Sequence, residues 1–416
     1  MSQSAGQADE PYDVLVVGGG LAGASLAHAL LGSGLRIGLV EAVAPGGADQ
    51  PSYDERTTAI SWGSRQLFED LGLWSAMQRE AAPILRLHVS QQGSFGTTRV
   101  HCDDYGVPAL GYVLPNRALG QALFASLADQ PEVEVICPAR FETLRTRDDA
   151  LEITTRDGQA TRTLSARLLV GADGGRSAVR EALGIGSRVD DYHQKAIVTQ
   201  LRPGRDHEGQ AFERFCPGGP LAVLPSGPDR CAVVWALASD VADRLMAADD
   251  ETFLAELQAA FGWRLGRLTE PAGRHAYPLL RLLSRHPVAP RAVLVGNAAH
   301  NLHPAAAQGF NLTLRDVVLL ASLLREGRAA GREAGDAELL RHWADARAAD
   351  QARVSGFTDG IVRLFSNRLP GVSQARALGL TLLDSLPAIK QGMARRSMGL
   401  SMDRANIAQP LPDGQP

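Results

Sequence analysis

The feature that most constrains the fold is a glycine-rich turn between two apolar runs near the N-terminus. Residues 13–41 read DVLVVGGGLAGASLAHALLGSGLRIGLVE. The run over 14–17 predicts a buried parallel strand, residues 24–31 predict a helix, and residues 36–40 predict a second strand. Gly18, Gly20 and Gly23 stand between the first strand and the helix. This order predicts a βαβ unit with a dinucleotide at its turn.

Each glycine of this motif has a separate physical task. Gly18 permits the tight turn, Gly20 lets the backbone approach a pyrophosphate, and Gly23 lets the helix pack closely on the strand. The helix N-terminus offers free N–H groups and partial positive charge to the phosphates. Glu41 closes the second strand, where its carboxylate can accept hydrogen bonds from a ribose diol. The motif alone does not separate NAD from FAD, and a glycine turn without a ligand is the alternative.

Two further strand ends carry small residues toward predicted helices. Residues 166–183 (ARLLVGADGGRSAVREAL) predict a strand over 168–170, then Asp173, then a helix from near Ser177. Residues 292–295 predict another strand, and 296–316 read GNAAHNLHPAAAQGFNLTLRD. We expect a buried helix over 312–324 with Asn311 as its N-cap. The alanines and glycines before it leave room for a wide, flat ligand beside the helix N-terminus.

The two histidines of the third segment raise the alternative of a metal site. Paired helical histidine ligands require i,i+4 spacing, whereas His300 and His303 are three apart, and Pro304 disfavours a helix here. No carboxylate lies between them and no cysteine is near. We therefore predict that these histidines bind no metal and that they line or brace a pocket instead.

Composition sets the outer limits. A chain of 416 residues suggests two or three domains, and a net charge of −4 argues against a nucleic-acid partner. The four cysteines show no CxxC spacing, which indicates a reducing compartment. The polar N-terminal stretch does not resemble a signal peptide, and no apolar run reaches the ~20 residues needed to span a bilayer. We expect a cytoplasmic protein, peripheral at the inner face of a membrane at most.

The three segments, in this order, resemble the class A FAD-dependent aromatic hydroxylases, which share the para-hydroxybenzoate hydroxylase fold. GGGLAG is similar to the ADP-binding motif of that group, GADGGRSAVR to its central Asp-Gly motif, and the segment 296–316 to its C-terminal flavin motif. Residues 53–61 (YDERTTAIS) resemble the signature of the ubiquinone-biosynthesis branch. Residues 112–124 (YVLPNRALGQALF) resemble a helix whose arginine, here Arg117, reaches the FAD pyrophosphate. The resemblance runs from about residue 12 to about residue 400.

Two positions depart from the pattern of the group. Asn297 stands where most members have Asp, and Ala307 stands where many have Gly. Asn keeps one acceptor and gains two donors, so it can still bind a ribityl hydroxyl. The GNAA form is associated with the branch that hydroxylates 2-polyprenyl-6-methoxyphenol, so this departure favours the subgroup. Ala307 adds one methyl group close to the expected flavin.

The resemblance implies an α/β fold in which a Rossmann-like FAD-binding domain is interleaved with an antiparallel-sheet substrate domain and followed by C-terminal helices. We expect the FAD-binding domain over 1–72, 108–183 and 283–330, the β-rich domain over 73–107 and 184–282, a helical region over 331–404 and a disordered tail over 405–416. The implied cofactor-binding residues are Gly18, Gly20, Ala22, Gly23, Glu41, Arg56, Arg117, Asp173, Gly296, Asn297, Pro304, Gln308, Gly309 and Asn311.

The resemblance also implies the chemistry. NAD(P)H, a transient co-substrate, reduces FAD, and O₂ then gives a flavin C4a-hydroperoxide that hydroxylates a phenol. On 2-polyprenyl-6-methoxyphenol both ortho carbons are occupied, so the para carbon is attacked and a 2-polyprenyl-6-methoxy-1,4-benzoquinol forms. The protein positions the reactants and excludes water. Arg56 is the candidate catalytic residue, as a cation that faces the flavin; a loop salt bridge is its equal alternative. No acid or base stands out.

The middle and the C-terminal parts of the chain are less specific. Apolar runs over 195–200, 221–224 and 232–236 predict an antiparallel sheet, and residues 85–101 predict a hairpin added to it. Residues 333–364 show helical spacing. For 372–392, with Arg395, Arg396 and Arg404 beyond it, two interpretations stay open: contact with a membrane surface, and a helix packed on the sheet domain.

Alternative functions also stay open. The chain could hydroxylate another ring position of a ubiquinone precursor or another phenol, and GxGxxG alone also permits an NAD-dependent dehydrogenase. A protein of another class, a non-catalytic flavin-fold subunit among ubiquinone-biosynthesis proteins, is the third alternative. A yellow protein that takes up FAD separates the hydroxylases from the dehydrogenase.

Overall fold

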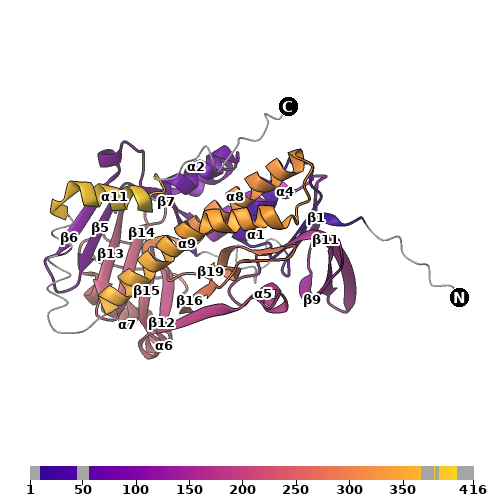
Figure 1. Ribbon diagram of the computed structural model, residues 1–416. Helices are drawn as coiled ribbons and strands as arrows, with labels where there is room; N and C mark the ends of the chain where they lie inside the picture. Colours follow the sequence, from indigo (N-terminus) through magenta and orange to yellow (C-terminus); the bar gives the residue numbers. More distant parts are fainter. Residues whose placement is uncertain (1–9, 45–55, 367–378, 380–383, 401–416) are drawn as a thin grey trace.

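Two large sheets and the helices that join them make up the chain (Figure 1). The computed structural model describes residues 10–44, 56–366, 379 and 384–400. Residues 53–55, 372–378, 380–383, Arg404 and the tail over 405–416 lie outside this part, and the expectations for them stay predictions.

The first sheet contains the strand that precedes the glycine-rich turn. Its described strands run in the order β17 (Val288–Ala289), β18 (Ala292–Leu294), β11 (Ala160–Gly171), β1 (Tyr12–Val17), β2 (Ile37–Val40) and β8 (Val133–Ile136). The four neighbours from β18 to β2, and β8 beyond them, pair in parallel. β1 is buried along its whole length, as its continuous apolar run predicts. β9 (Arg140–Thr146) and β10 (Leu151–Asp157) extend β11 as an antiparallel meander.

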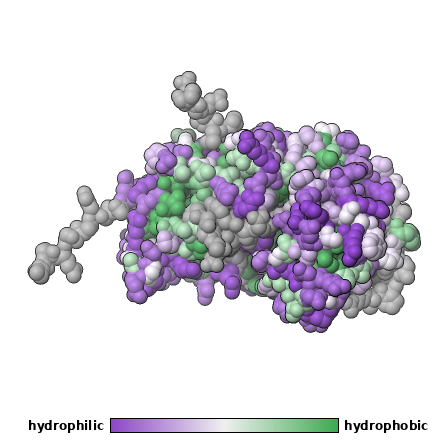
Figure 2. Space-filling view, turned by 180° about the vertical axis from the view of Figure 1, so that it is seen from behind, coloured by the Kyte–Doolittle hydropathy of each residue, from purple (hydrophilic) through white to green (hydrophobic). Residues whose placement is uncertain are grey.

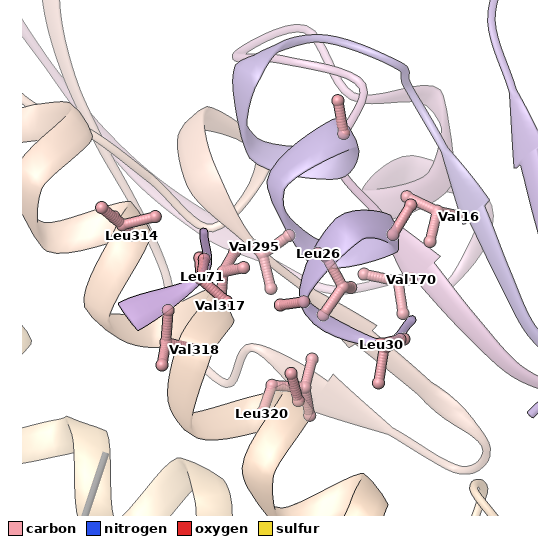
Figure 3. Close-up of a cluster of buried hydrophobic side chains, with 14 of the residues drawn as sticks. Val16, Leu26, Leu30, Leu71, Val170, Val295, Leu314, Val317, Val318 and Leu320 are labelled. Carbon is pink, nitrogen blue, oxygen red and sulfur yellow. The ribbon is translucent and has the colours of Figure 1, made fainter. Parts of the chain in front are cut away.

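Helices cover both faces of the first sheet. One face packs against α1 (Leu21–Ala29), α4 (Asn116–Leu127) and α8 (Gly309–Ala329). Figure 3 shows Val16, Val170 and Val295 from the strand ends pointing toward Leu26 of α1 and Val317 of α8. The other face packs against the meander and the short helix α5 (Ala178–Ala182). This packing fixes where the strands end, and therefore where the glycine turns lie.

The second sheet lies beside the first. Its described strands run in the order β19 (His300–Asn301), β16 (His275–Ser284), β12 (Ser187–Leu201), β15 (Cys231–Ala238), β14 (Gly219–Pro225), β13 (Gln210–Cys216), β5 (Arg86–Gln91) and β6 (Thr97–His101). The predicted hairpin over 85–101 is β5–β6 and joins this sheet at its edge. The expected antiparallel sheet is confirmed for all of these strand pairs except one, because β5 runs parallel to β13. The reason is that the hairpin enters from another part of the chain.

The two faces of the second sheet have different environments. Its outer face packs on α6 (Ser239–Ala247) and α7 (Asp250–Phe261) through a buried aromatic and aliphatic cluster. These helices were not predicted from the sequence. The opposite face, here called the inner face, carries smaller residues such as Ala196, Ala236 and Val234. Figure 2 shows one side of the molecule, on which hydrophilic residues predominate over the half containing this sheet.

Shorter elements connect the two halves. β3 (Thr57–Ser61), β7 (Gly111–Pro115) and β4 (Ala82–Ile84) form a small antiparallel sheet. The helices α2 (Trp62–Asp70) and α3 (Trp74–Met77) follow β3. The long helix α9 (Ala337–Ser366) packs against α8 and reaches β14 of the second sheet (Figure 1). Among the described residues, no helix combines the length and apolar character that crossing a membrane requires.

The described part of the C-terminal region, α11 (Pro387–Ser397), packs on the sheets. Ala394 and Met398 are buried with Val100 and Trp62, and the Met398 carbonyl accepts a hydrogen bond from the Gly63 N–H at 2.7 Å. Arg395 and Arg396 lie in its last turn. One side of the described helix therefore packs on the protein, as the second interpretation of this region expects. Leu386 and Ile389 remain about half exposed.

Candidate FAD and substrate site

The three strand ends that carry the sequence motifs are neighbours in one sheet. Val17 is in register with Gly171, and Gly171 with Leu294. Hydrogen bonds continue past the strands, from the Ala172 N–H to the Val17 carbonyl at 2.8 Å and from the Val295 N–H to the Gly171 carbonyl at 2.9 Å. The carboxyl ends of parallel strands form the usual ligand-binding edge of such a sheet.

Two glycines of the first motif are required by protein packing. Gly18 has a φ of +105°, and a Cβ there would lie 2.5 Å from the Ala172 carbonyl oxygen. A Cβ on Gly23 would lie 1.9 Å from the Gly18 carbonyl oxygen. Gly20 precedes α1, and α1 has no side-chain cap. Its first N–H groups are therefore available to a ligand, as the motif predicts.

The acidic residues beside this turn are engaged by the backbone. The Glu41 carboxylate is buried and accepts hydrogen bonds from the N–H groups of Gly19 at 2.6 Å and Val43 at 2.8 Å. Asp173 accepts from the Ser177 hydroxyl and from the Val179 N–H at 3.1 Å, and so holds the start of α5. Each carboxylate oxygen can accept a further bond, so both remain candidates for ligand contact.

Gly296 joins the first and third motifs. Its φ is +61°, and an added Cβ would lie 3.0 Å from the Cβ of Ala22 and 3.4 Å from Cγ2 of Thr313. The starts of α1 and α8 therefore meet at this glycine. Asn297 beside it and Pro304 further along are exposed. Exposure leaves both accessible to a bound molecule.

The start of α8 differs from the prediction. The helix begins at Gly309 with Gln308 at the N-cap position, so Asn311 lies inside the helix and is not its cap. Its side chain instead accepts a hydrogen bond from the Ser61 N–H at 2.8 Å and donates to the carbonyls of Ala59 at 3.0 Å and Ala307 at 2.6 Å. Asn311 thus ties β3 and the turn over Ala305–Ala307, here called the alanine turn, to α8. This tertiary contact was not visible in the local pattern that suggested a cap.

The alanine turn has an unusual backbone at Ala307. Its φ is +50°, in the left-handed region that glycine adopts without cost. This is the position at which the sequence departs from the glycine that the resemblance leads us to expect in many members of the group. The chain keeps the turn geometry despite the methyl group. The strain belongs to the part of the site expected to face the flavin.

The histidines of the third motif brace the structure. His300 Nε2 lies 2.6 Å from Asp316 Oδ2, and Arg347 also bonds Asp316; all three side chains are buried. Burial alone would raise the pKa of Asp316, but the His300 hydrogen bond and the Arg347 charge outweigh it and lower that pKa. The described residues contain no cluster of His, Cys, Asp or Glu able to hold a metal.

His303 is buried beside this network and makes different contacts. Its Nδ1 accepts a hydrogen bond from the Ala305 N–H at 3.1 Å, and its ring meets Tyr192 edge-on at 5.1 Å. Burial lowers the pKa of His303 to about 4. The imidazole is therefore neutral at pH 7 and acts as an acceptor that shapes the alanine turn.

Arg56 and Arg117 lie in different surroundings. The Arg56 guanidinium stacks over the Tyr277 ring at 4.8 Å and lines a cavity of about 450 Å³ together with Val198 and His275 of the second sheet. Arg117, at the start of α4, forms an ion pair with Glu80 at 2.5 Å. The structure thus places Arg56 at a cavity whose other lining residues belong to the part of the chain that holds the second sheet, and Arg117 within an ion pair.

Sequence reasoning missed Glu213, a carboxyl group on the inner face of the second sheet. Glu213 pairs with Ala222, Ala222 with Val234, and Val234 with Val198 of the cavity, so all share one face. Its Oε1 atom is inaccessible and has no hydrogen-bond partner. Burial raises the pKa of Glu213 to about 7. Strand alternation places Glu213 between Phe212 and Arg214, which face outward, but no local pattern marks it.

The residues at the strand ends fit a dinucleotide with a wide ring. A Cβ added to half-buried Gly309 would meet nothing within 4 Å, so the backbone at the start of α8 borders open space. α8, like α1, has no side-chain cap. Two uncapped helix N-termini that meet at Gly296 provide N–H donors for the anionic and electron-rich parts of one extended ligand.

Comparison with known proteins identifies the class. The family model described as "FAD binding domain" matches residues 11–358. The p-nitrophenol 4-monooxygenase PnpA of Pseudomonas putida superimposes with a TM-score of 0.78 at 16% identity, over 96% of this chain and 99% of that one. The fold is therefore that of the para-hydroxybenzoate hydroxylases.

Comparison with curated relatives shows which group of these FAD-binding proteins the chain resembles. The ubiquinone hydroxylase UbiL of Rhodospirillum rubrum is 39% identical over 95% of this chain and 91% of its own length. The 3-demethoxyubiquinol 3-hydroxylase of Escherichia coli is 33% identical over 94% of this chain and 100% of its own length. The chain belongs to the FAD-binding class A aromatic hydroxylases, in the group of the ubiquinone-biosynthesis hydroxylases. It is a FAD-dependent monooxygenase of a class that uses NAD(P)H.

Proposed function

We propose that this enzyme hydroxylates the ring of a polyprenylated ubiquinone precursor. The observation that carries the proposal is the position of Arg56. It directly precedes β3, the strand to which Asn311 of α8 is bonded, and it lines the cavity on the second sheet. A cavity of about 450 Å³ can hold a substituted phenol and the first part of its tail. The relatives named for ubiquinone hydroxylation support the same substrate class.

The strand-end residues have distinct tasks in holding FAD. Gly18, Gly20 and Gly23 bring the start of α1 to the pyrophosphate, with Ala22 and Gly296 beside it. Glu41 accepts from the adenosine ribose. We assign the remaining contacts with the pyrophosphate, ribityl chain and ring to Arg117, Asp173, Asn297, Pro304, Gln308 and Gly309. For Arg117, this contact requires the guanidinium to leave Glu80.

The start of α8 supplies the electrostatic part of the mechanism. Bound FAD supplies electron transfer from NAD(P)H and activation of O₂ for insertion of one oxygen atom into the ring. The uncapped N–H groups of α8 stabilise negative charge on the adjoining edge of the ring system, because they are fixed in place before the reaction. Arg56 adds a positive charge on the cavity side. The inner face of the second sheet excludes water.

The proposed position of hydroxylation is para to the phenol hydroxyl. A phenol donates electron density to its ortho and para carbons. In 2-polyprenyl-6-methoxyphenol both ortho carbons carry substituents, so only the para carbon is open, and the product is 2-polyprenyl-6-methoxy-1,4-benzoquinol. The apolar tail should dominate affinity, since each buried CH₂ contributes ~0.8 kcal/mol.

A second ring position is the main alternative. The Escherichia coli relative is named for hydroxylation at carbon 3 of a demethoxyubiquinol. Profiling of lipid-soluble quinones in a strain that lacks this protein separates the two. Accumulation of 2-polyprenyl-6-methoxyphenol supports the para position. Accumulation of a demethoxylated quinol, or unchanged quinones, contradicts it.

Contact with a membrane surface is proposed for the C-terminal region. On α11, Leu386 and Ile389 are exposed beside Lys390, and Arg395 and Arg396 follow. Apolar and cationic side chains on one exposed helix favour the interface of an anionic bilayer. A variant truncated before residue 370 should lose binding to liposomes. Unchanged binding of that variant would show that α11 only packs on the sheets.

A further inference from the structure

A basic cleft lies on the outer face of the second sheet, away from the Arg56 cavity. It has a volume of about 360 Å³, and its lining includes Arg86, Arg99, Arg264, His88 and His101. β5 and β6 contribute four of these side chains, and Arg264 follows α7. Among the described residues that line it, none is acidic. The cleft therefore concentrates positive charge on a protein whose net charge is −4.

Of the three arginines in this cleft, one has a carboxylate partner and two have none among the described residues. Arg86 forms an ion pair with Glu208 at 2.8 Å. Within the described residues, the guanidinium groups of Arg99 and Arg264 have no carboxylate partner. Asp384 accepts a hydrogen bond from the backbone N–H of Arg99 at 3.2 Å, and its carboxylate forms an ion pair with Lys390 at 3.1 Å. Burial and the charges of Arg214 and Arg99 lower the pKa of Arg264, so these cations repel one another.

His88 is a second, independent sign of a ligand. Its side chain lines the cleft but is only 4% exposed, and its ring is fixed edge-on against Phe212 at 5.8 Å. The Nε2 atom is buried and has no hydrogen-bond partner in the part of the chain that the structure describes. Burial, together with the charges of Arg264, Arg99 and Arg214, lowers the pKa of His88 to about 4. A neutral imidazole beside unpaired arginines can donate one hydrogen bond to an anion.

We propose that this cleft binds a phosphate-bearing ligand, with the Arg99 and Arg264 guanidinium groups on its oxygens and His88 donating from Nε2. Guanidinium forks match phosphate oxygens in pairs, which favours phosphate over a spherical anion. The volume exceeds that of a single phosphate, so a diphosphate or a phosphorylated headgroup fits better. The ligand is not the hydride donor of the reaction, because strand alternation puts His88 and the inner-face residue Val89 on opposite sides of the sheet.

Pyrophosphate and lipid vesicles test the proposal on the FAD-loaded full chain. Histidine imidazole ¹⁵N signals are followed by NMR while pyrophosphate is added. We expect saturable binding that raises the pKa of His88, because a bound anion favours the imidazolium. The double variant Arg99→Gln/Arg264→Gln should weaken binding about 100-fold, roughly tenfold for each lost charge-assisted contact. Arg267→Gln, which removes an exposed arginine outside the lining, is the matched control.

Flotation with phosphatidylglycerol vesicles identifies the source of the phosphate. Binding that pyrophosphate displaces and that the double variant loses indicates a lipid headgroup. Pyrophosphate binding without flotation indicates a soluble phosphorylated ligand. Unperturbed His88 signals at millimolar pyrophosphate, or equal losses in Arg267→Gln and the double variant, would overturn the proposal. Hydroxylase activity is not a readout of this experiment, so its outcome is independent of the substrate proposed above.

Discussion

The strand-end site of the first sheet and the inner face of the second sheet are built on different principles. At the strand ends, backbone atoms touch backbone atoms: Gly23 meets Gly18, Gly18 meets Ala172, and Gly296 meets α1. On the inner face, side chains such as Glu213 form the surface, and the Oε1 atom of Glu213 has no hydrogen-bond partner among the described residues. We propose that the first region binds the cofactor; at Gly18, Gly23 and Gly296 its packing leaves almost no room for an added atom. The second region can vary its side chains, which suits a choice among ring substrates.

The largest expected effect comes from a substitution that disrupts the backbone packing of the strand-end site. Gly23→Ala places a Cβ 1.9 Å from the Gly18 carbonyl oxygen, so α1 must move away from the sheet. Overpacking of this kind costs roughly 3 kcal/mol, and FAD affinity should fall about 100-fold or more. Fluorescence titration of the apoprotein with FAD measures the affinity of each variant for FAD. Gly356→Ala, where nothing lies within 4 Å of the new Cβ, should bind FAD like the parent. If Gly23→Ala bound FAD as tightly as the parent protein, the close backbone packing at Gly23 would not be needed for FAD binding.

The next effect concerns the support beneath the alanine turn. Asp316→Ala leaves Arg347 and His300 buried without their common acceptor. Breaking a buried ion pair costs about 3–5 kcal/mol of the free energy of unfolding. Urea denaturation of the FAD-loaded protein checks this, with Asp316→Asn as the milder variant and exposed Asp345→Ala as the control. A loss no larger than that of Asp345→Ala would mean that the network carries little stability.

The inner face should show a smaller effect that depends on pH. The folded-state pKa of Glu213 is about 7, against an ordinary value of 4.5. Between these values the unfolded chain is ionised and the folded one is not, so the penalty grows as pH rises from 4.5 to 7. Glu213→Gln should therefore stabilise the protein at pH 8 by about 1–3 kcal/mol, with little gain at pH 4.5.

Thermal denaturation at both pH values measures the Glu213 effect. The exposed Glu326→Gln is its matched control, because its side chain lies at the surface of α8. A pH-independent gain would show that Glu213 does not titrate in this range. Glu213→Gln could also lose hydroxylase activity while it gains stability. That combination would show that the inner face keeps a destabilising side chain for its function, unlike the strand-end site.

The smallest effect lies where the two regions meet. Ala307→Gly removes the strain of a φ of +50° but adds freedom to the unfolded chain, so a net gain of about 1 kcal/mol or less is expected. Ala305→Gly, two residues earlier and without a positive φ, should destabilise instead. The two melting temperatures are compared directly. If both variants lose stability equally, the turn is not strained at Ala307.

The sequence predicted the first region better than the second. Its motifs report local backbone requirements, so the turn after β1 and the three strand ends followed from glycine spacing and apolar runs. Asn311 was misassigned because its bonds to β3 join residues about 250 positions apart. Glu213 and the parallel pairing of β5 with β13 depend on which strands become neighbours, which no local pattern encodes. The domain boundaries and the cofactor contacts stay predictions.

A crystal structure of the FAD-bound protein tests the account most directly. We expect the ADP half at the start of α1 beside Glu41, and the ring system in van der Waals contact, about 4 Å, with the backbone from Ala307 to Gly309. A ring system bound away from the start of α8, with the alanine turn facing only protein or solvent, would contradict the account.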